Sequence, residues 1–165
     1  MKRFIIMFVV LVPLALAAQK TPVDKLFDKY ANQKGFTTVN ITGKLLGMAG
    51  KLDSSNPSTS DMLNNISGIR ILSVDDSALN NRLNFYQELE SEGFFRNNKY
   101  EILMEVTESD EVVKFFSMDA GQGKISELLL VVGGKSNAII SIRGLIDPEN
   151  IGKITGTLNV NIPEK

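Results

Sequence analysis

Carboxylates are the side chains of this chain whose type and spacing allow chemistry. The sequence contains no histidine and no cysteine, which excludes Ser-His-Asp and Cys-His catalysis as well as zinc sites built on imidazole or thiolate. Glu101 and Glu105 alternate with apolar residues, so a strand would place both on one face, with α-carbons roughly 13 Å apart. Glycosidases hold their two carboxyl groups about 5 to 9.5 Å apart. Side chains could close that gap. Glu101, Glu105 and Glu127 are therefore the candidates for a carboxylate-dependent hydrolase.

A structural role explains the same glutamates better. Alternating glutamates are usual on a half-exposed strand, where they are solvated or ion-paired, and the chain has no tryptophan to form a sugar-binding platform. The aspartates form no D-x-[DN]-x-[DN]-G calcium pattern, and no G-x-x-x-x-G-K-[ST] phosphate loop occurs. We therefore expect a protein that is not an enzyme and has no catalytic residue, no metal site and no cofactor.

Four apolar, β-branched runs in the second half of the chain predict an antiparallel β-meander. Turn-forming segments separate them at residues 108–110, 119–123 and 133–136. The runs are Tyr100–Val106, Val112–Met118, Ile125–Val132 and Ala138–Gly144.

The two-residue period of a strand sorts the side chains of these runs onto two faces. The first face should pack on helices and carries Lys114 and Glu127 near enough to pair. Its other members are Tyr100, Ile102, Met104, Val106, Val112, Phe116, Met118, Ile125, Leu129, Val131, Ala138, Ile140 and Ile142. The second face mixes polar side chains with Leu103, Val113, Phe115, Leu128, Leu130, Val132 and Ile139, and its polar members are Glu101, Glu105, Ser117, Ser126, Ser141 and Arg143.

A sheet face in contact with water should be more polar than this second face. It should therefore be covered by the chain's own segments, by another subunit or by a ligand. Self-coverage is the simplest of these, because large exposed apolar patches are uncommon on monomers.

Helices and two further strands are expected before the meander. Thr21, Pro22 and Asp24 form a helix start, and the apolar residues from Val23 to Ala31 follow helical spacing, with Gly35 as the stop. The other expected elements are strands at Phe36–Thr42 and Gly68–Val74, a short helix at Lys44–Leu52, a longer helix at Ala78–Glu92 capped within Asp75–Ser77, and a final strand or extended arm at Thr155–Ile162. The resulting fold class is α+β, with a mostly antiparallel sheet and helices on one face.

The amino terminus predicts a signal peptide over residues 1–18. Lys2 and Arg3 form a basic region, Phe4 to Leu16 is apolar, and Ala15-Leu16-Ala17 fits a small-x-small cleavage signal. The apolar run is shorter than the roughly 20 residues of a membrane span. The remaining residues 19–165 suit a single exported domain, periplasmic or extracellular, without a stable membrane span.

The rest of the composition fits such an exported domain. The absence of cysteine excludes disulfides and thiol chemistry. Without Lys2 and Arg3 the chain has 16 basic and 19 acidic residues, so its net charge of −3 and the lack of a basic cluster argue against nucleic-acid binding.

The pattern of apolar residues and glycines resembles a family known as domain of unknown function 4252, found in secreted and envelope proteins of Gram-negative anaerobes and their relatives. The resemblance implies no established activity and no catalytic residues. Many relatives look like lipoproteins, and this chain differs in having no lipid-accepting cysteine. The segments that carry the resemblance are Val23–Tyr30, Val39–Ile41, Leu45–Met48, Ile69–Val74, Tyr100–Val106, Ile125–Val132 and Ile139–Asp147.

Asp76-Ser77-Ala78 resembles the acceptor motif for O-glycosylation in the same bacteria. A helix cap at Ser77 explains the same residue without any modification.

These observations together predict a non-enzymatic binding domain linked to the cell envelope. The expected binding residues are the apolar ones of the second face, and the partner is left open between self-association, an envelope protein and an apolar ligand. The residues are Leu103, Phe115, Leu128, Leu130 and Ile139.

Overall fold

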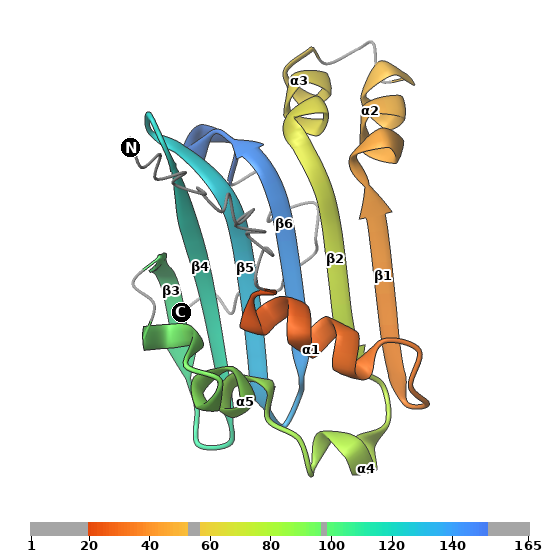
Figure 1. Cartoon of the computed structure of the whole chain (residues 1–165), viewed down its shortest axis with the longest axis vertical. Coiled ribbons are helices and arrows are strands. Elements are labelled where there is room, and N and C mark those ends of the chain that lie inside the picture. The colour runs from red at the N-terminus through yellow and green to blue at the C-terminus, as the bar shows by residue number, and fades with distance from the viewer. Residues whose placement is uncertain (1–19, 53–56, 97–98, 152–165) are drawn as a thin grey trace, which may run out of the picture.

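The computed structural model describes residues 20–52, 57–96 and 99–151. Its centre is one six-stranded antiparallel sheet with the order β1-β2-β6-β5-β4-β3, shown in Figure 1. The predicted α+β class and the meander, which is β3 to β6, are confirmed. The strands are β1 (Phe36–Thr42), β2 (Ile66–Val74), β3 (Tyr100–Thr107), β4 (Glu111–Gly121), β5 (Lys124–Gly134) and β6 (Ala138–Ile146).

The two strands that precede the meander join it on the free side of β6. β2 pairs with β6 through pairs such as Ile71 with Ile140, and β1 pairs with β2 on its outer side. The sequence left this placement open, because neither strand is joined to the meander by a short turn. As a result, β1 and β3 are the two edges of the sheet.

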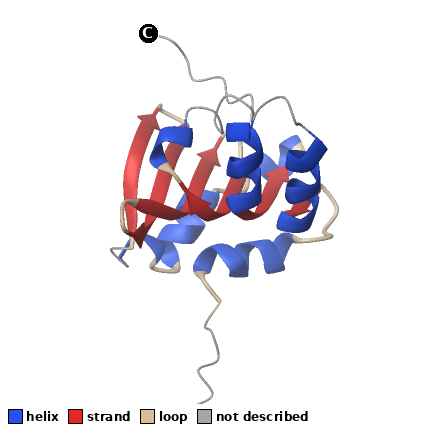
Figure 2. Cartoon of the chain, turned by 90° about the horizontal axis from the view of Figure 1, so that it is seen from above, coloured by secondary structure: helices blue, strands red, loops and turns tan. Residues whose placement is uncertain are grey.

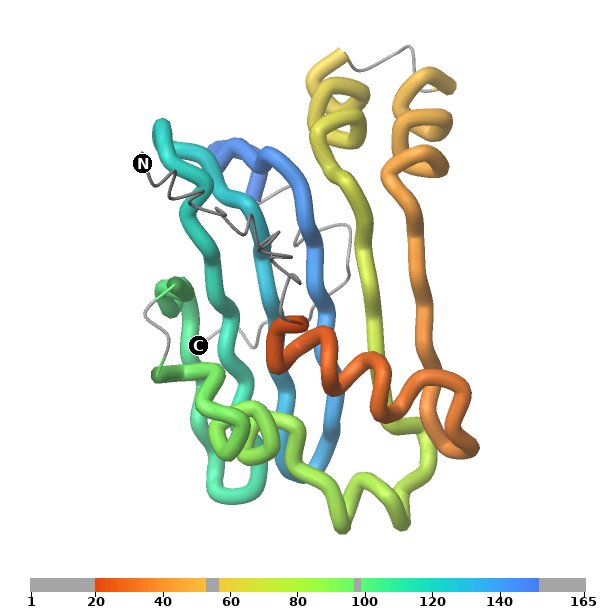
Figure 3. Tube along the Cα trace, in the orientation of Figure 1, coloured from red at the N-terminus to blue at the C-terminus, as the bar shows by residue number. Residues whose placement is uncertain are grey.

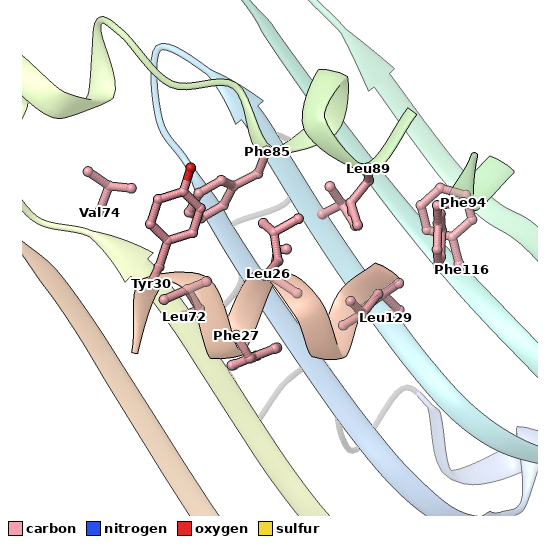
Figure 4. Packing of buried hydrophobic residues seen from close by; sticks show 13 residues of the cluster. Leu26, Phe27, Tyr30, Leu72, Val74, Phe85, Leu89, Phe94, Phe116 and Leu129 are labelled. Carbon is pink, nitrogen blue, oxygen red and sulfur yellow. The ribbon is translucent and has the colours of Figure 1, made fainter. Parts of the chain in front are cut away.

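Helix α1 (Pro22–Tyr30) begins as its sequence predicts. Thr21 is the N-cap, and its hydroxyl accepts a hydrogen bond from the Asp24 amide at 3.1 Å while the Asp24 carboxylate accepts one from the Thr21 amide. The helix ends at Tyr30, before Gly35. Its apolar stripe is buried on the sheet, where each such side chain contributes about 1.5–3 kcal/mol. Figure 4 shows this packing, which joins α1 to Leu72, Val74, Phe85, Leu89 and Leu129.

The predicted helix over residues 78–92 is wrong as a single element. It is divided into α4 (Ser77–Asn80) and α5 (Phe85–Ser91), followed by the short helix η1 (Phe94–Arg96). Asp76 rather than Ser77 caps α4, and Asn84 caps α5 by accepting from the Gln87 amide at 3.0 Å. Asparagine side chains compete with helical backbone bonds, which explains the break.

The buried side chain of Asn137 holds the break in place. Its amide group donates to the carbonyl of Leu83 at 3.1 Å, and its side-chain oxygen accepts from the Phe85 amide at 2.8 Å. The turn before β6 thus fixes the start of α5.

Two further helices, α2 (Gly43–Leu52) and α3 (Pro57–Asn65), extend β1 and β2 at one end of the sheet, as the tube in Figure 3 shows. In Figure 2 they lie toward the side of the sheet opposite α1. The buried residues accordingly form two clusters. The cluster under α1, α5 and η1 contains Leu129, Val131 and Ile139, and the second joins Leu46 of α2 to Ile66, Leu128 and Ile142.

None of the helices in the described ranges is long and apolar enough to cross a membrane. The predicted signal peptide, residues 1–18, and the predicted strand at Thr155–Ile162 lie outside the described residues. A single-turn helix, η2 (Pro148–Asn150), ends the described part.

Candidate functional site

The register between β5 and β6 corrects the predicted faces of the sheet. Leu130 lies opposite Ile140 and Val131 lies opposite Ile139, and residues that lie opposite one another share a face. Ile139 therefore lies on the face that α1 covers, together with Ser141 and Arg143, whereas Ala138, Ile140 and Ile142 lie on the second face. The predicted faces of β6 are wrong by one residue, because the connection between Val132 and Ala138 sets the register and alternation alone does not.

Two β-bulges place further residues on the face opposite to the predicted one. A register shift between Ile102 and Met104 places Met104 opposite Phe115 and Glu105 opposite Lys114. Met104 and Val106 therefore belong to the second face, and Glu105 to the helix-covered face. A shift between Ile125 and Glu127 likewise brings Ile125 into the second-face cluster. Bulges insert a residue without interrupting the apolar pattern, so the sequence does not reveal them.

The corrected register aligns one apolar side chain from each strand on the second face. We name this line of six residues the apolar row. Its central residue, Leu130, is 9% exposed and its end residue, Val39, is 37% exposed. In sheet order the row is Val39, Ile71, Ile140, Leu130, Phe115 and Met104.

The five residues predicted to bind a partner do not form one exposed surface. Leu128 and Ile139 are both fully buried, in different clusters on opposite faces. Leu130 is buried in the apolar row and Phe115 is half-buried beside it. Leu103 is 45% exposed and lies at the bulge on the β3 edge. Only Leu103 is accessible enough to meet a partner without rearrangement.

The three candidate carboxylates are also kept apart. Glu101 lies opposite Ser117 on the second face, whereas Glu105 and Glu127 lie on the helix-covered face. Glu105 pairs with Lys114 at 3.1 Å. The predicted pair of Lys114 with Glu127 is therefore wrong, and the predicted placement of Glu101 and Glu105 on one face is wrong because of the bulge.

Glu127 is 1% exposed and is held by three donors. It accepts hydrogen bonds from the Tyr100 hydroxyl at 2.7 Å and the Ser141 hydroxyl at 2.5 Å, and it pairs with Nε of Arg143 at 3.1 Å. Burial, and then the negative charge of Glu127, raise the pKa of the Tyr100 phenol above its usual range. This carboxylate has no free approach for a substrate, and its contacts are those of a structural anchor.

Asp24 extends the same network to α1. Its carboxylate pairs with Nη2 of Arg70 at 2.6 Å and with Nη2 of Arg143 at 3.2 Å. Burial raises the pKa of Asp24, but the hydrogen bond from Thr21 and the two guanidinium charges outweigh burial and lower it. The Arg70 guanidinium also lies over the Phe27 ring, 4.1 Å from its centroid. The network therefore fastens α1 to β2, β5 and β6.

A cavity of about 220 Å³ borders Arg70, Arg143 and Ser141. The two guanidinium groups that face it are already paired with Asp24 and Glu127. The cavity therefore offers no uncompensated charge to a ligand. Among the described residues, no group of three or more carboxylates is placed to hold a metal ion.

The accessible apolar surface lies elsewhere, on the side of the molecule formed by β1 and α2. We name this surface the β1–α2 side, and its members are Val39, Leu45, Met48 and Leu52. Leu45, Met48 and Leu52 are 57%, 51% and 85% exposed, and their spacing places them on one face of α2. The opposite face of α2 carries Gly50, where a Cβ would lie 3.2 Å from the backbone of Ser60 in α3.

The β1 strand that borders this stripe is uncharged and regular. It pairs with β2 from Phe36 to Thr42 without a register shift, and residues 37–40 are exposed. The sequence predicts the strand and the helix, but it does not show which apolar residues of α2 are exposed. No signal in the sequence separates Leu45 from Leu46, since adjacent apolar residues such as Leu26 and Phe27 of α1 are both buried.

Comparison with known proteins adds a family. A family model described as a domain of unknown function, DUF4252, matches residues 30–154. No curated protein and no solved structure matches the chain.

Proposed function

Since the chain belongs to the DUF4252 family, whose description assigns no activity, we propose from its own surfaces that it is an exported, non-enzymatic interaction domain that binds a polypeptide along the β1–α2 side. The observation that carries the proposal is the distribution of exposed large apolar residues. Four of the seven in the described part of the chain are Val39, Leu45, Met48 and Leu52, and the others are Ile102, Leu103 and Leu145.

The chemistry of this side favours a polypeptide over a small apolar ligand. An edge strand offers unpaired N–H and C=O groups, and an extended peptide can satisfy them by adding a strand. The apolar stripe of α2 then supplies a contact for the partner's apolar side chains. Lys44 and Lys51 are exposed on the same helix, so acidic residues beside the partner's apolar ones would complement them.

The absence of enzymatic activity is supported by the side chains. The chain has no histidine or cysteine, Glu127 is enclosed by its three donors, and Glu101 lies on the face opposite Glu105. No described carboxylate pair therefore supports the hydrolase alternative. Export and a place in the cell envelope rest on the signal-peptide pattern of residues 1–18.

Site-specific photo-crosslinking in the producing cell tests the proposal. A photoreactive residue at Met48 or Leu52 should give the same covalent adduct with one exported protein. The adduct should disappear when Leu45→Asp is added. A photoreactive residue at Gln87 or Glu90, both exposed on α5, is the matched control. Equal adducts at the α5 and α2 positions, or none at α2, would refute binding at the β1–α2 side.

A further inference from the structure

The two edges of the sheet differ in their protection against strand pairing. Proteins usually protect edge strands with charges, bulges or short length. β3 has a bulge near Leu103 and carries Glu101 and Glu105, whereas β1 has seven regularly paired residues and no charge. Among the described residues, β1 is therefore the edge that is open to another strand.

We propose that β1 pairs in antiparallel fashion with β1 of a second copy of this chain, about a two-fold axis at Val39. The inference rests on the proposed function, since it names one partner of the same side. Pairing centred on Val39 would place Thr38 opposite Asn40 of the partner subunit and Thr37 opposite Ile41 of the partner subunit. No charged residue meets a like charge anywhere along this strand pair.

The apolar row supports a second copy in particular. The row crosses all six strands and ends at Val39, which is 37% exposed. A two-fold axis perpendicular to the sheet keeps the second faces of both copies on one side. Val39 would then meet Val39 of the partner subunit, and the row would continue without a break into the second sheet. A heterologous strand would need its own apolar residue at this position, whereas a second copy brings one.

The charges at the two ends of β1 also favour antiparallel self-pairing. Asp75 and Asp76 lie beside the start of the strand together with Lys34, and Lys44 follows its end. Antiparallel pairing places the start of one β1 beside the end of the other. Two carboxylates and one ammonium group would thus face one ammonium group, an attractive arrangement at both ends.

The size of the contact sets the expected affinity. Stable protein interfaces bury about 1,200–2,000 Å² in total, and weaker, transient contacts bury less. A single pair of seven-residue strands lies at the lower limit, so we expect a dissociation constant in the micromolar range, on the order of 1–100 µM.

Disulfide trapping tests the register. The chain has no native cysteine, so a single Val39→Cys substitution introduces the only thiol. Under mild oxidation the full exported chain should form a covalent dimer, because opposite residues of antiparallel strands have Cβ atoms about 4.5–5.5 Å apart. Ile102→Cys, which places an exposed cysteine on the β3 edge, is the matched control and should stay monomeric. Equal trapping at both positions would overturn the pairing.

Variants with opposite charges at position 39 distinguish a specific strand pair from disulfide formation by random collision. Val39→Lys should raise the dissociation constant of the dimer at least tenfold, and so should Val39→Glu, because each places like charges opposite one another. An equimolar mixture of the two variants should restore a dimer by sedimentation, whereas Ile102→Lys should change the constant less than twofold. Circular dichroism checks that each variant is folded. A wild-type chain that stays monomeric at millimolar concentration, or no recovery in the mixture, would overturn the inference.

The outcomes separate this inference from the proposed function. A monomeric chain whose Met48 position still yields a specific adduct would refute the second copy and leave the β1–α2 side as a binding surface. A Val39-dependent dimer without any Met48 adduct would refute the exported partner and leave the strand pairing.

Discussion

The β1 and β3 edges belong to the same sheet, yet they contact the core through different groups. β3 carries Tyr100, whose ring lies 4.7 Å from that of Phe94 and whose hydroxyl binds Glu127. β1 has an aromatic residue only at its start, where Phe36 stacks on Tyr30 at 4.6 Å, and its next four residues are exposed. The aromatic and polar contacts of β3 stabilise that edge, and the uncharged, accessible β1 is the edge for which we propose binding.

The two edges should differ most in stability when aromatic packing is removed. Phe94 is 3% exposed and contacts Tyr100 and Phe116, so Phe94→Ala should lower the free energy of unfolding by about 3–5 kcal/mol. Leu52 is 85% exposed on the other side, and Leu52→Ala should change it by less than about 0.5 kcal/mol. Urea unfolding of both variants measures the contrast. Equal losses would mean that the β1–α2 side contributes as much to stability as the aromatic cluster does.

A smaller effect should follow from the hydrogen bond that fastens β3. Tyr100→Phe removes the hydroxyl that donates to the buried Glu127 carboxylate, which should cost about 1.5–3 kcal/mol. Tyr86→Phe is the comparison, since it removes a hydroxyl that interacts with the Lys114 ammonium group and not with the buried Glu127 carboxylate. Thermal unfolding compares the two variants. A loss for Tyr86→Phe as large as that for Tyr100→Phe would show that the Glu127 network does not distinguish β3.

The smallest effect concerns pH and the Asp24 carboxylate, whose ion pairs join α1 to Arg70 of β2 and Arg143 of β6 but not to β1. The pKa of Asp24 is lowered from 3.8, so its contribution is fully present above that unfolded value and is lost as pH falls through the lower folded value. Asp24→Asn should therefore reduce stability at neutral pH and flatten its decline below about pH 4. Urea midpoints between pH 2 and 7, on the order of five values, measure this. If the urea midpoint of the variant falls with pH as steeply as that of the wild type, Asp24 does not contribute to the loss of stability in acid.

Local chemistry in the sequence was sufficient for the strands and for the start of α1, and insufficient for the break between α4 and α5 and for the register of the sheet. The β1 boundaries, Phe36–Thr42, and the Thr21 cap of α1 agree with prediction, because alternation and capping are properties of neighbouring residues. Ile139 was placed on the wrong face because its orientation depends on a pairing across the sheet. A register slip of one residue reverses every side chain of a strand.

The sequence did not indicate the exposed apolar residues of the β1–α2 side for a related reason. The apolar residues of the second face drew the prediction to Leu128, which is fully buried. Composition cannot distinguish a second core from an exposed patch, because both are apolar. On α2, Leu45 and Leu46 are neighbours in sequence, but only Leu46 is buried. Which of the two leucines is buried depends on the position of α3.

Hydrogen exchange of the backbone amides tests the central comparison most directly. The full chain would be measured well below and well above micromolar concentration, with residues 36–42 and 100–107 compared in the same experiment. The account predicts that the outward amides of β1 become protected at the higher concentration while those of β3 exchange at an unchanged rate. Protection that appears on β3, or that is independent of concentration on both edges, would contradict it.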